Sequence, residues 1–159
     1  MIDFIIKQAE TGDEVVILDF IRKLADYEEL PGEVVASEEN LRESLFSNTP
    51  SAGAIIGYFE GKPIGVAVYF FNFSTFKGKQ GLYLEDIIIL PEYRGHGFGK
   101  EMMKHLARLA VESGCSRFEW AVLDWNIYAI DFYKSLGAEP MDGWTVFRLY
   151  GDKLKELAD

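Results

Sequence analysis

The chain has 159 residues and a net charge of −10, with 26 acidic against 16 Lys and Arg residues. This length suits one domain with a core of its own, so we expect a single domain over residues 1–159. The acidic charge argues against a nucleic-acid partner, whose phosphates it would repel, and the single cysteine excludes an intrachain disulfide.

Neither a signal-peptide pattern nor an apolar run of membrane length is found, so we expect a cytoplasmic protein with no membrane partner. Two histidines and one cysteine leave no cluster of metal ligands, and we expect no metal ion. Residues 1–60 hold 13 acidic and four basic side chains. This asymmetry favours a cationic substrate, although blocks of Glu are more often a solvated surface.

The N-terminal part predicts a strand and a helix. Residues 3–9 fit a strand, and Thr11 and Glu14 have the spacing of a capping box at the start of a helix. Pro31-Gly32 is expected to end this unit. Apolar residues at helical spacing predict the buried face of the helix: Val15, Leu18, Ile21, Leu24 and Ala25.

A second helix and two strands are expected next. Ser37 is a plausible cap for a helix that stops before Pro50. Two apolar segments, residues 52–59 and 63–72, have the length and composition of strands. The short connection at 60–62 fits a hairpin between them.

Residues 81–112 predict a buried strand (81–90), a glycine loop and an amphipathic helix. The glycines allow backbone N–H groups to approach a phosphate, and the first helical turn adds free donors at the positive end of the helix dipole. The loop is therefore predicted to bind an anion. Its residues are Arg94, Gly95, His96, Gly97, Phe98, Gly99 and Lys100, and the helix should bury Phe98, Met102, Leu106, Leu109 and Ala110.

The spacing excludes two other phosphate loops. A P-loop requires Ser or Thr after Gly-Lys, where this chain has Glu101, and a dinucleotide fingerprint requires glycine where it has Lys100. The remaining pattern, Arg-x-x-Gly-x-Gly at a strand-to-helix junction, resembles the coenzyme A pyrophosphate loop of the GNAT N-acetyltransferase superfamily. An ordinary glycine-rich connection is the alternative for the loop alone.

The C-terminal part predicts a strand at 117–123, a helix at 126–136 ended by Gly137, a strand at 144–150 and a short helix at 153–157. Asn126, Ala129 and Tyr133 share one helix face. This pattern also resembles the GNAT superfamily, whose α/β fold has a central twisted mixed sheet flanked by helices. A core aromatic is the structural alternative for Tyr133.

Acetyl transfer from a thioester to an amine requires a deprotonated nitrogen, a donor to the oxyanion and a proton for the thiolate. Tyrosine is protonated at neutral pH and suits the last role, so Tyr133 is the expected acid. The resemblance implies that acetyl-CoA is held by the loop and Asn126, and that backbone N–H groups of Ile87, Ile88 and Ile89 bind the thioester carbonyl. It also implies that this strand splays from the strand at 117–123.

Two adjacent acids, Glu85 and Asp86, are candidates for the base. Side chains alternate along a strand, so the two should point to opposite faces unless a bulge intervenes. Glu85 stands among apolar residues, where burial would raise its pKa into a useful range, and it is the expected base. Asp86 could equally accept backbone hydrogen bonds, and a structural role stays open for both.

A narrower resemblance covers nearly the whole chain. The segments Leu24–Glu29, Leu82–Asp86, Tyr93–Gly99, Trp125-Asn126 and Phe132–Lys134 with Asp142–Trp144 together look like the diamine acetyltransferases, the spermidine/spermine and thialysine group. The resemblance implies a homodimer that acetylates a small cationic amine. Its acidic substrate channel would be lined by Tyr27, Glu28, Glu85 and Asp142.

Two other functions fit the same motifs. One is acetylation of a protein N-terminus or lysine, and the other is a non-catalytic acetyl-CoA sensor, against which the retention of Tyr133 argues. The connection at 60–62 is shorter than in the animal enzymes of the group, and Ser135 replaces a basic residue. The sequence leaves the amine open among spermidine, a short diamine, thialysine and another amino acid with a primary amine.

Overall fold

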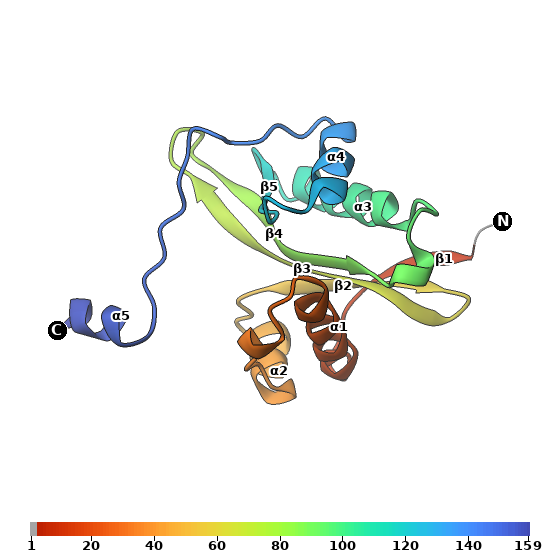
Figure 1. Cartoon of the computed structure of the whole chain (residues 1–159), viewed down its shortest axis with the longest axis horizontal. Helices are drawn as coiled ribbons and strands as arrows, with labels where there is room; N and C mark the ends of the chain where they lie inside the picture. Colours follow the sequence, from red (N-terminus) through yellow and green to blue (C-terminus); the bar gives the residue numbers. More distant parts are fainter. Residues whose placement is uncertain (1–2) are drawn as a thin grey trace. The chain divides into compact units, whose positions relative to one another are not determined.

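The computed structural model describes residues 3–159 (Figure 1). The chain divides into two compact units, residues 1–121 and 122–159, which are described separately, and the single domain stays a prediction. The first unit contains β1 (Phe4–Gln8), α1 (Glu14–Tyr27), α2 (Glu38–Phe46), β2 (Gly53–Phe59), β3 (Lys62–Ser74), β4 (Lys79–Ile89), α3 (Phe98–Glu112) and β5 (Phe118–Trp120). The second contains α4 (Ile127–Ser135) and α5 (Gly151–Ala158).

The first unit is built on a five-stranded sheet in the order β1-β2-β3-β4-β5. Neighbours from β1 to β4 are antiparallel, and β5 is parallel to β4, which makes the sheet mixed, as predicted. The predicted hairpin is confirmed, because Phe59 pairs with Lys62. Glu60 and Gly61 both have positive φ, 49° and 76°, as a tight two-residue hairpin turn requires.

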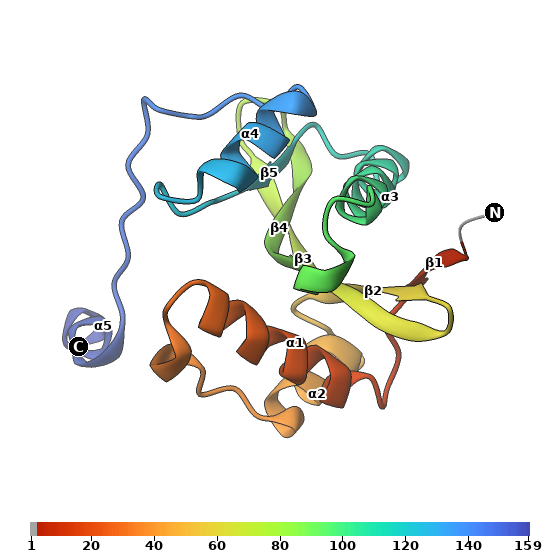
Figure 2. The ribbon, with the colours of Figure 1, turned by 45° about the vertical axis from the view of Figure 1, so that its right-hand side comes forward.

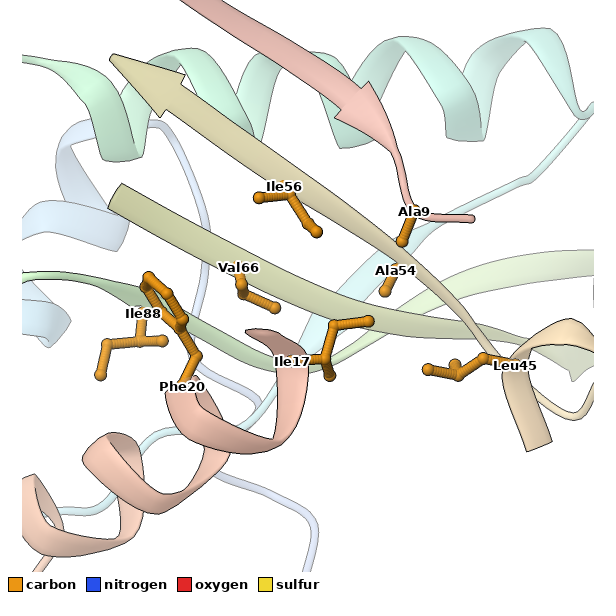
Figure 3. Close-up of a cluster of buried hydrophobic side chains, with 8 residues drawn as sticks. All are labelled: Ala9, Ile17, Phe20, Leu45, Ala54, Ile56, Val66 and Ile88. Carbon is orange, nitrogen blue, oxygen red and sulfur yellow. The ribbon is translucent and has the colours of Figure 1, made fainter. Parts of the chain in front are cut away.

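Helices cover both faces of the sheet (Figure 2): α1 and α2 lie on one face and α3 on the other. The first face buries a cluster of Ile17 and Phe20 from α1, Leu45 from α2, and residues of the strands, among them Val66 and Ile88 (Figure 3). On α3 the predicted stripe is buried at Phe98, Met102, Leu106 and Ala110, whereas Leu109 is half-buried. The hydrophobic periodicity therefore identified the core face of α3.

On α1 the prediction holds only in part: Leu18 is buried, Ile21, Leu24 and Ala25 are half-buried, and Val15 is 53% exposed. Ile17 and Phe20, which the predicted stripe left out, are buried instead.

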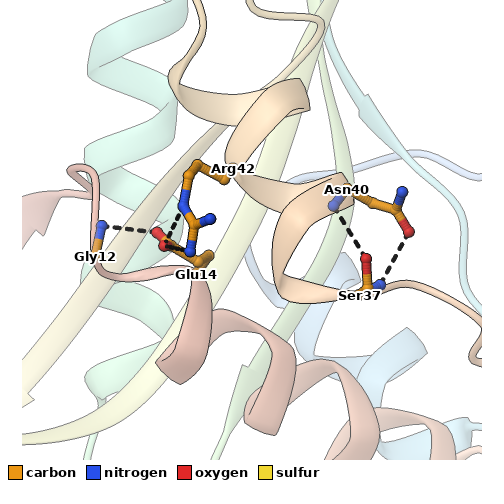
Figure 4. Close-up of polar contacts among 5 residues, drawn as sticks. All are labelled: Gly12, Glu14, Ser37, Asn40 and Arg42. Carbon is orange, nitrogen blue, oxygen red and sulfur yellow. Dashed lines mark hydrogen bonds and ion pairs between the residues drawn. The ribbon is translucent and has the colours of Figure 1, made fainter.

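The start of α1 differs from the prediction. The helix begins at Glu14, and Thr11 does not cap it. The Glu14 carboxylate instead accepts the Gly12 N–H at 2.7 Å and pairs with Arg42 of α2 at 2.6 Å (Figure 4). Its own backbone amide and then Arg42 and Gly12 lower its pKa against the effect of burial. The Glu14 carboxylate thus forms a tertiary ion pair between α1 and α2 and does not form the predicted capping box with Thr11.

The predicted cap of α2 is confirmed. The Asn40 N–H donates to Ser37 Oγ at 3.1 Å, and the Ser37 N–H donates to Asn40 Oδ1 at 3.0 Å (Figure 4). Both bonds join residues three apart, so the local sequence is sufficient to determine this helix start.

The second unit confirms two helices but not the last strand. Gly137 has φ +89° after α4, as predicted for a left-handed cap, and α5 contains the predicted helix at 153–157. No strand forms over residues 144–150, whose side chains are exposed. The apolar pattern is present, but a strand also needs the hydrogen bonds of a neighbour, and among residues 122–159 none supplies them.

Within residues 3–159, no helix has the length and apolar character needed to cross a bilayer. The same residues contain no group of three or more His, Cys, Asp or Glu side chains arranged to hold a metal ion.

Candidate active site

The glycine loop has the backbone form that anion binding requires. Gly95 and Gly97 have φ of +79° and +87°, and Gly97 is the N-cap of α3. The Glu101 N–H donates to the Gly97 oxygen at 3.1 Å, so the amides of residues 98–100 precede the first intrahelical bond. A side chain added at Gly95 or Gly97 would meet nothing within 4 Å. The loop is thus open where these two side chains would stand.

Arg94 joins the loop to two other elements. Its Nε donates to the Ile89 oxygen at the end of β4 at 2.9 Å. Its guanidinium carbon lies 4.7 Å from the centre of the ring of Tyr27, the last residue of α1. The predicted cofactor residue Arg94 and the predicted substrate residue Tyr27 are therefore in contact.

Two loop side chains support the loop itself. His96 Nδ1 lies 2.9 Å from the Arg94 oxygen, and its ring stacks on Phe98 with centroids 6.0 Å apart. Phe98 is buried against Phe4 and Phe59. The side chain of Phe98 is part of the core and is not available to the cofactor. If Phe98 contacts the cofactor as predicted, it does so through its backbone amide.

β4 contains a bulge at the predicted base. Val68 of β3 lies opposite Asp86 and Tyr69 lies opposite Leu84, so Glu85 has no cross-strand partner. Glu85 is exposed, so the expectation that it is buried is wrong. The bulge also removes the simple alternation that would separate Glu85 from Asp86 on opposite faces.

Asp86 is the more buried of the two acids. It lies two residues from Ile88, on the face that α1 covers. Burial, followed by the like charges of Glu85 and Glu28, raises its pKa to about 6. Glu28, directly after α1, also has a raised pKa, caused by burial. Three carboxylates therefore gather where the end of α1 crosses the bulge.

The outer edge of β4 is open beyond the bulge. β5 pairs with β4 only at Leu82–Leu84, where the Leu82 N–H donates to the Arg117 oxygen at 3.0 Å. The Leu90 N–H donates to Ile64 of β3 at 2.9 Å, so alternation turns the N–H of Ile88 toward β3 and those of Ile87 and Ile89 outward. The prediction that the Ile88 N–H binds the thioester carbonyl is therefore wrong, because β3 takes this group. Within residues 3–121, β5 ends before it can pair with these two groups. β5 is thus shorter than the strand predicted at 117–123, and the splay of the two strands stays a prediction.

Three predicted site residues lie in the second unit. Asn126 caps α4, and its Oδ1 accepts the Ala129 N–H at 3.3 Å. Tyr133 is half-buried in α4 with its ring centre 5.4 Å from that of Phe132, and Asp142 is exposed. Their roles toward cofactor and substrate stay predictions.

The first unit thus brings together Tyr27, Glu28, Glu85 and the glycine loop around the end of β4. The sequence did not show that Asp86 is the more buried of the two acids. The sequence places two adjacent acids, Glu85 and Asp86, between apolar residues, which indicates that one of them is buried. Side-chain alternation alone does not say which one.

Known proteins resemble this chain, two of the following three over nearly its whole length. A thialysine N-epsilon-acetyltransferase of Bos taurus is 42% identical over 164 residues, which cover 96% of each chain. The L-ornithine N5-acetyltransferase of Arabidopsis thaliana is 43% identical over 93 residues, 58% of this chain and 41% of that protein. An integron cassette protein from the mobile metagenome of V. cholerae has a TM-score of 0.82 and 28% identity, with 99% of both chains covered.

The profile of the acetyltransferase (GNAT) family matches residues 19–138. This range includes the bulge, the glycine loop and α4, and it crosses the boundary between the two units. The predicted family and fold are confirmed, and the chain belongs to the GNAT family of acetyltransferases.

Proposed function

We propose that this acetyltransferase moves the acetyl group of acetyl-CoA to a primary amine of a small cationic substrate. The observation that carries the proposal is the cluster of Glu28, Glu85 and Asp86 near the glycine loop, which leads into the free first-turn amides of α3. Negative charge attracts an ammonium group, and the loop supplies donors for a diphosphate. The named activities of two relatives, on thialysine and on ornithine, agree with an amine substrate.

The loop and β4 bind different parts of acetyl-CoA. Backbone amides at residues 95–100 and the charges of Arg94 and Lys100 hold the diphosphate, with Asn126 as a further contact. The outward N–H groups of Ile87 and Ile89 bind pantetheine and the thioester carbonyl. The amine enters between Tyr27 and the acids, with Asp142 as a further carboxylate.

The reaction is a direct attack. A carboxylate at the bulge takes a proton from the ammonium group, and the neutral nitrogen attacks the thioester carbon. The new C–N bond forms as the C–S bond breaks, and Tyr133 donates a proton to the departing thiolate. Tyr133 recovers a proton from the acetylated nitrogen, so that the products are an amide, the free thiol and one proton.

The test measures release of the coenzyme A thiol with spermidine, short diamines, thialysine, ornithine, lysine and peptides. We expect release well above acetyl-CoA hydrolysis with one or more of the small cationic amines. Preference for peptides would favour protein acetylation instead. Binding of acetyl-CoA without release for any amine would favour a sensor.

We further propose a homodimer. Trp144, Val146 and Phe147 in the segment 144–150 are exposed, Val146 to 87% and Phe147 to 92%, and monomers rarely expose such contiguous apolar groups. A second copy that covers this segment would remove the exposure. The resemblance to the diamine acetyltransferases implies the same state.

The double variant Val146→Asp/Phe147→Asp is therefore expected to be monomeric, because two charges in an apolar contact are strongly unfavourable. Light scattering after gel filtration should give twice the 18.1 kDa chain mass for the wild type and the single mass for the variant. Val35→Asp, at an exposed apolar position outside this segment, should stay dimeric. A monomeric wild type would contradict the proposal.

A further inference from the structure

The two acids at the bulge of β4 have different environments although they are adjacent. Glu85 occupies the bulge position and is exposed. Asp86 is half-buried and lies on the same face as Ile88, which packs in the core with Phe20 of α1. A proton acceptor needs a shielded environment, which raises its pKa, whereas a group that attracts a cation must stay charged and accessible.

We propose that Asp86, rather than Glu85, takes the proton from the substrate ammonium group, and that Glu85 and Glu28 attract and hold the cation. This assignment rests on the proposed function and deepens it. The proton leaves the nitrogen for an Asp86 carboxylate oxygen, directly or through one water molecule. The lone pair that is set free forms the bond to the acetyl carbon, and Asp86 later returns the proton to solvent.

Position along the strand supports this role. Asp86 directly precedes Ile87, whose N–H points to the open edge of β4 where the thioester carbonyl is proposed to bind. The proton acceptor and the donor to the oxyanion would then stand on consecutive residues. Because they share one rigid strand, their separation would be fixed before the substrate arrives.

The charge environment supports it as well. The groups that raise the Asp86 pKa to about 6, besides burial, are Glu85 in its own strand and Glu28 at the end of α1. Asp86 is then mostly ionised at neutral pH, yet it holds a proton far better than an ordinary aspartate. Activity should fall as the pH drops through about 6, since a protonated Asp86 cannot accept a proton.

The first experiment compares Asp86→Asn with Glu85→Gln, using an amine that the wild type accepts. Asp86→Asn should lower kcat by about 10²-fold or more. Glu85→Gln should raise KM several-fold with little change in kcat. It should also move the acidic limb of kcat/KM to lower pH, because it removes a like charge beside Asp86. Loss of the acidic limb together with a hundredfold lower kcat in Glu85→Gln would overturn the assignment.

A second measurement separates proton transfer from a structural defect. Trifluoroethylamine is largely uncharged at neutral pH and needs no base to release its lone pair. The loss of kcat in Asp86→Asn should shrink to within a few-fold with this amine, whereas a distorted site would lose activity with both. An undiminished loss would overturn the assignment. Unchanged acetyl-CoA affinity of Asp86→Asn by calorimetry would show that the loop is intact.

The two proposals fail differently. If the wild type releases no thiol with any amine, the proposed function is wrong. If the wild type transfers acetyl groups and Asp86→Asn keeps its kcat within a few-fold, only the assignment of Asp86 is wrong.

Discussion

Tyr133→Phe is expected to lower kcat by about 10²-fold or more while leaving acetyl-CoA affinity nearly unchanged. The substitution removes only the phenolic hydroxyl. If Tyr133 gives a proton to the departing thiolate, its loss raises the barrier of the chemical step and does not affect binding of the diphosphate. The measurements are steady-state thiol release and calorimetric titration with acetyl-CoA.

A matched control lies on the same helix. Tyr128 of α4 is 90% exposed, and Tyr128→Phe removes the same atom from the solvent face. It should keep the wild-type kcat. A Tyr133→Phe enzyme with unchanged kcat would remove Tyr133 from the mechanism and leave it the structural role that its half-buried ring also fits.

Gly97→Ala is expected to weaken acetyl-CoA binding by about 10- to 10²-fold. Gly97 has φ +87° at the N-cap of α3, a conformation that alanine adopts with strain of about 1–2 kcal/mol. Relaxation would turn the loop amides, and each backbone hydrogen bond to a charged group contributes about 1.5–3 kcal/mol. Loss of one such bond accounts for the expected factor. Calorimetry measures it directly.

Gly114→Ala is the control at the other end of α3. Gly114 has φ +71°, and a side chain added there also meets nothing within 4 Å. Both variants should therefore lose similar thermal stability, whereas only Gly97→Ala should lose affinity for acetyl-CoA. Equal affinities in the two variants would contradict the assignment of the loop.

Several features followed from short stretches of sequence. The cap formed by Ser37 and Asn40, the left-handed Gly137 and the buried stripe of α3 each depend on residues within a few turns of one another. The glycine loop is of the same kind, because positive φ and free first-turn amides are local properties. The family could be identified early because its loop motif is also local.

Other features depended on segments far apart in the chain. The bulge at Glu85 is a matter of register between β3 and β4, and the burial of Asp86 depends on α1 crossing the sheet. Glu14 does not form the predicted capping box because its carboxylate accepts a hydrogen bond from Arg42, 28 residues away. The segment 144–150 has the apolar pattern of a strand, but its own unit supplies no partner.

The sequence by itself determined the glycine turn before α3, most of the elements and the residue types of the candidate site, because these depend on backbone conformation and side-chain periodicity over short distances. Only the tertiary structure decided which acid at the bulge is shielded from water. That choice follows from strand register and helix packing, which bring together groups more than fifty residues apart, such as Glu28 and Asp86.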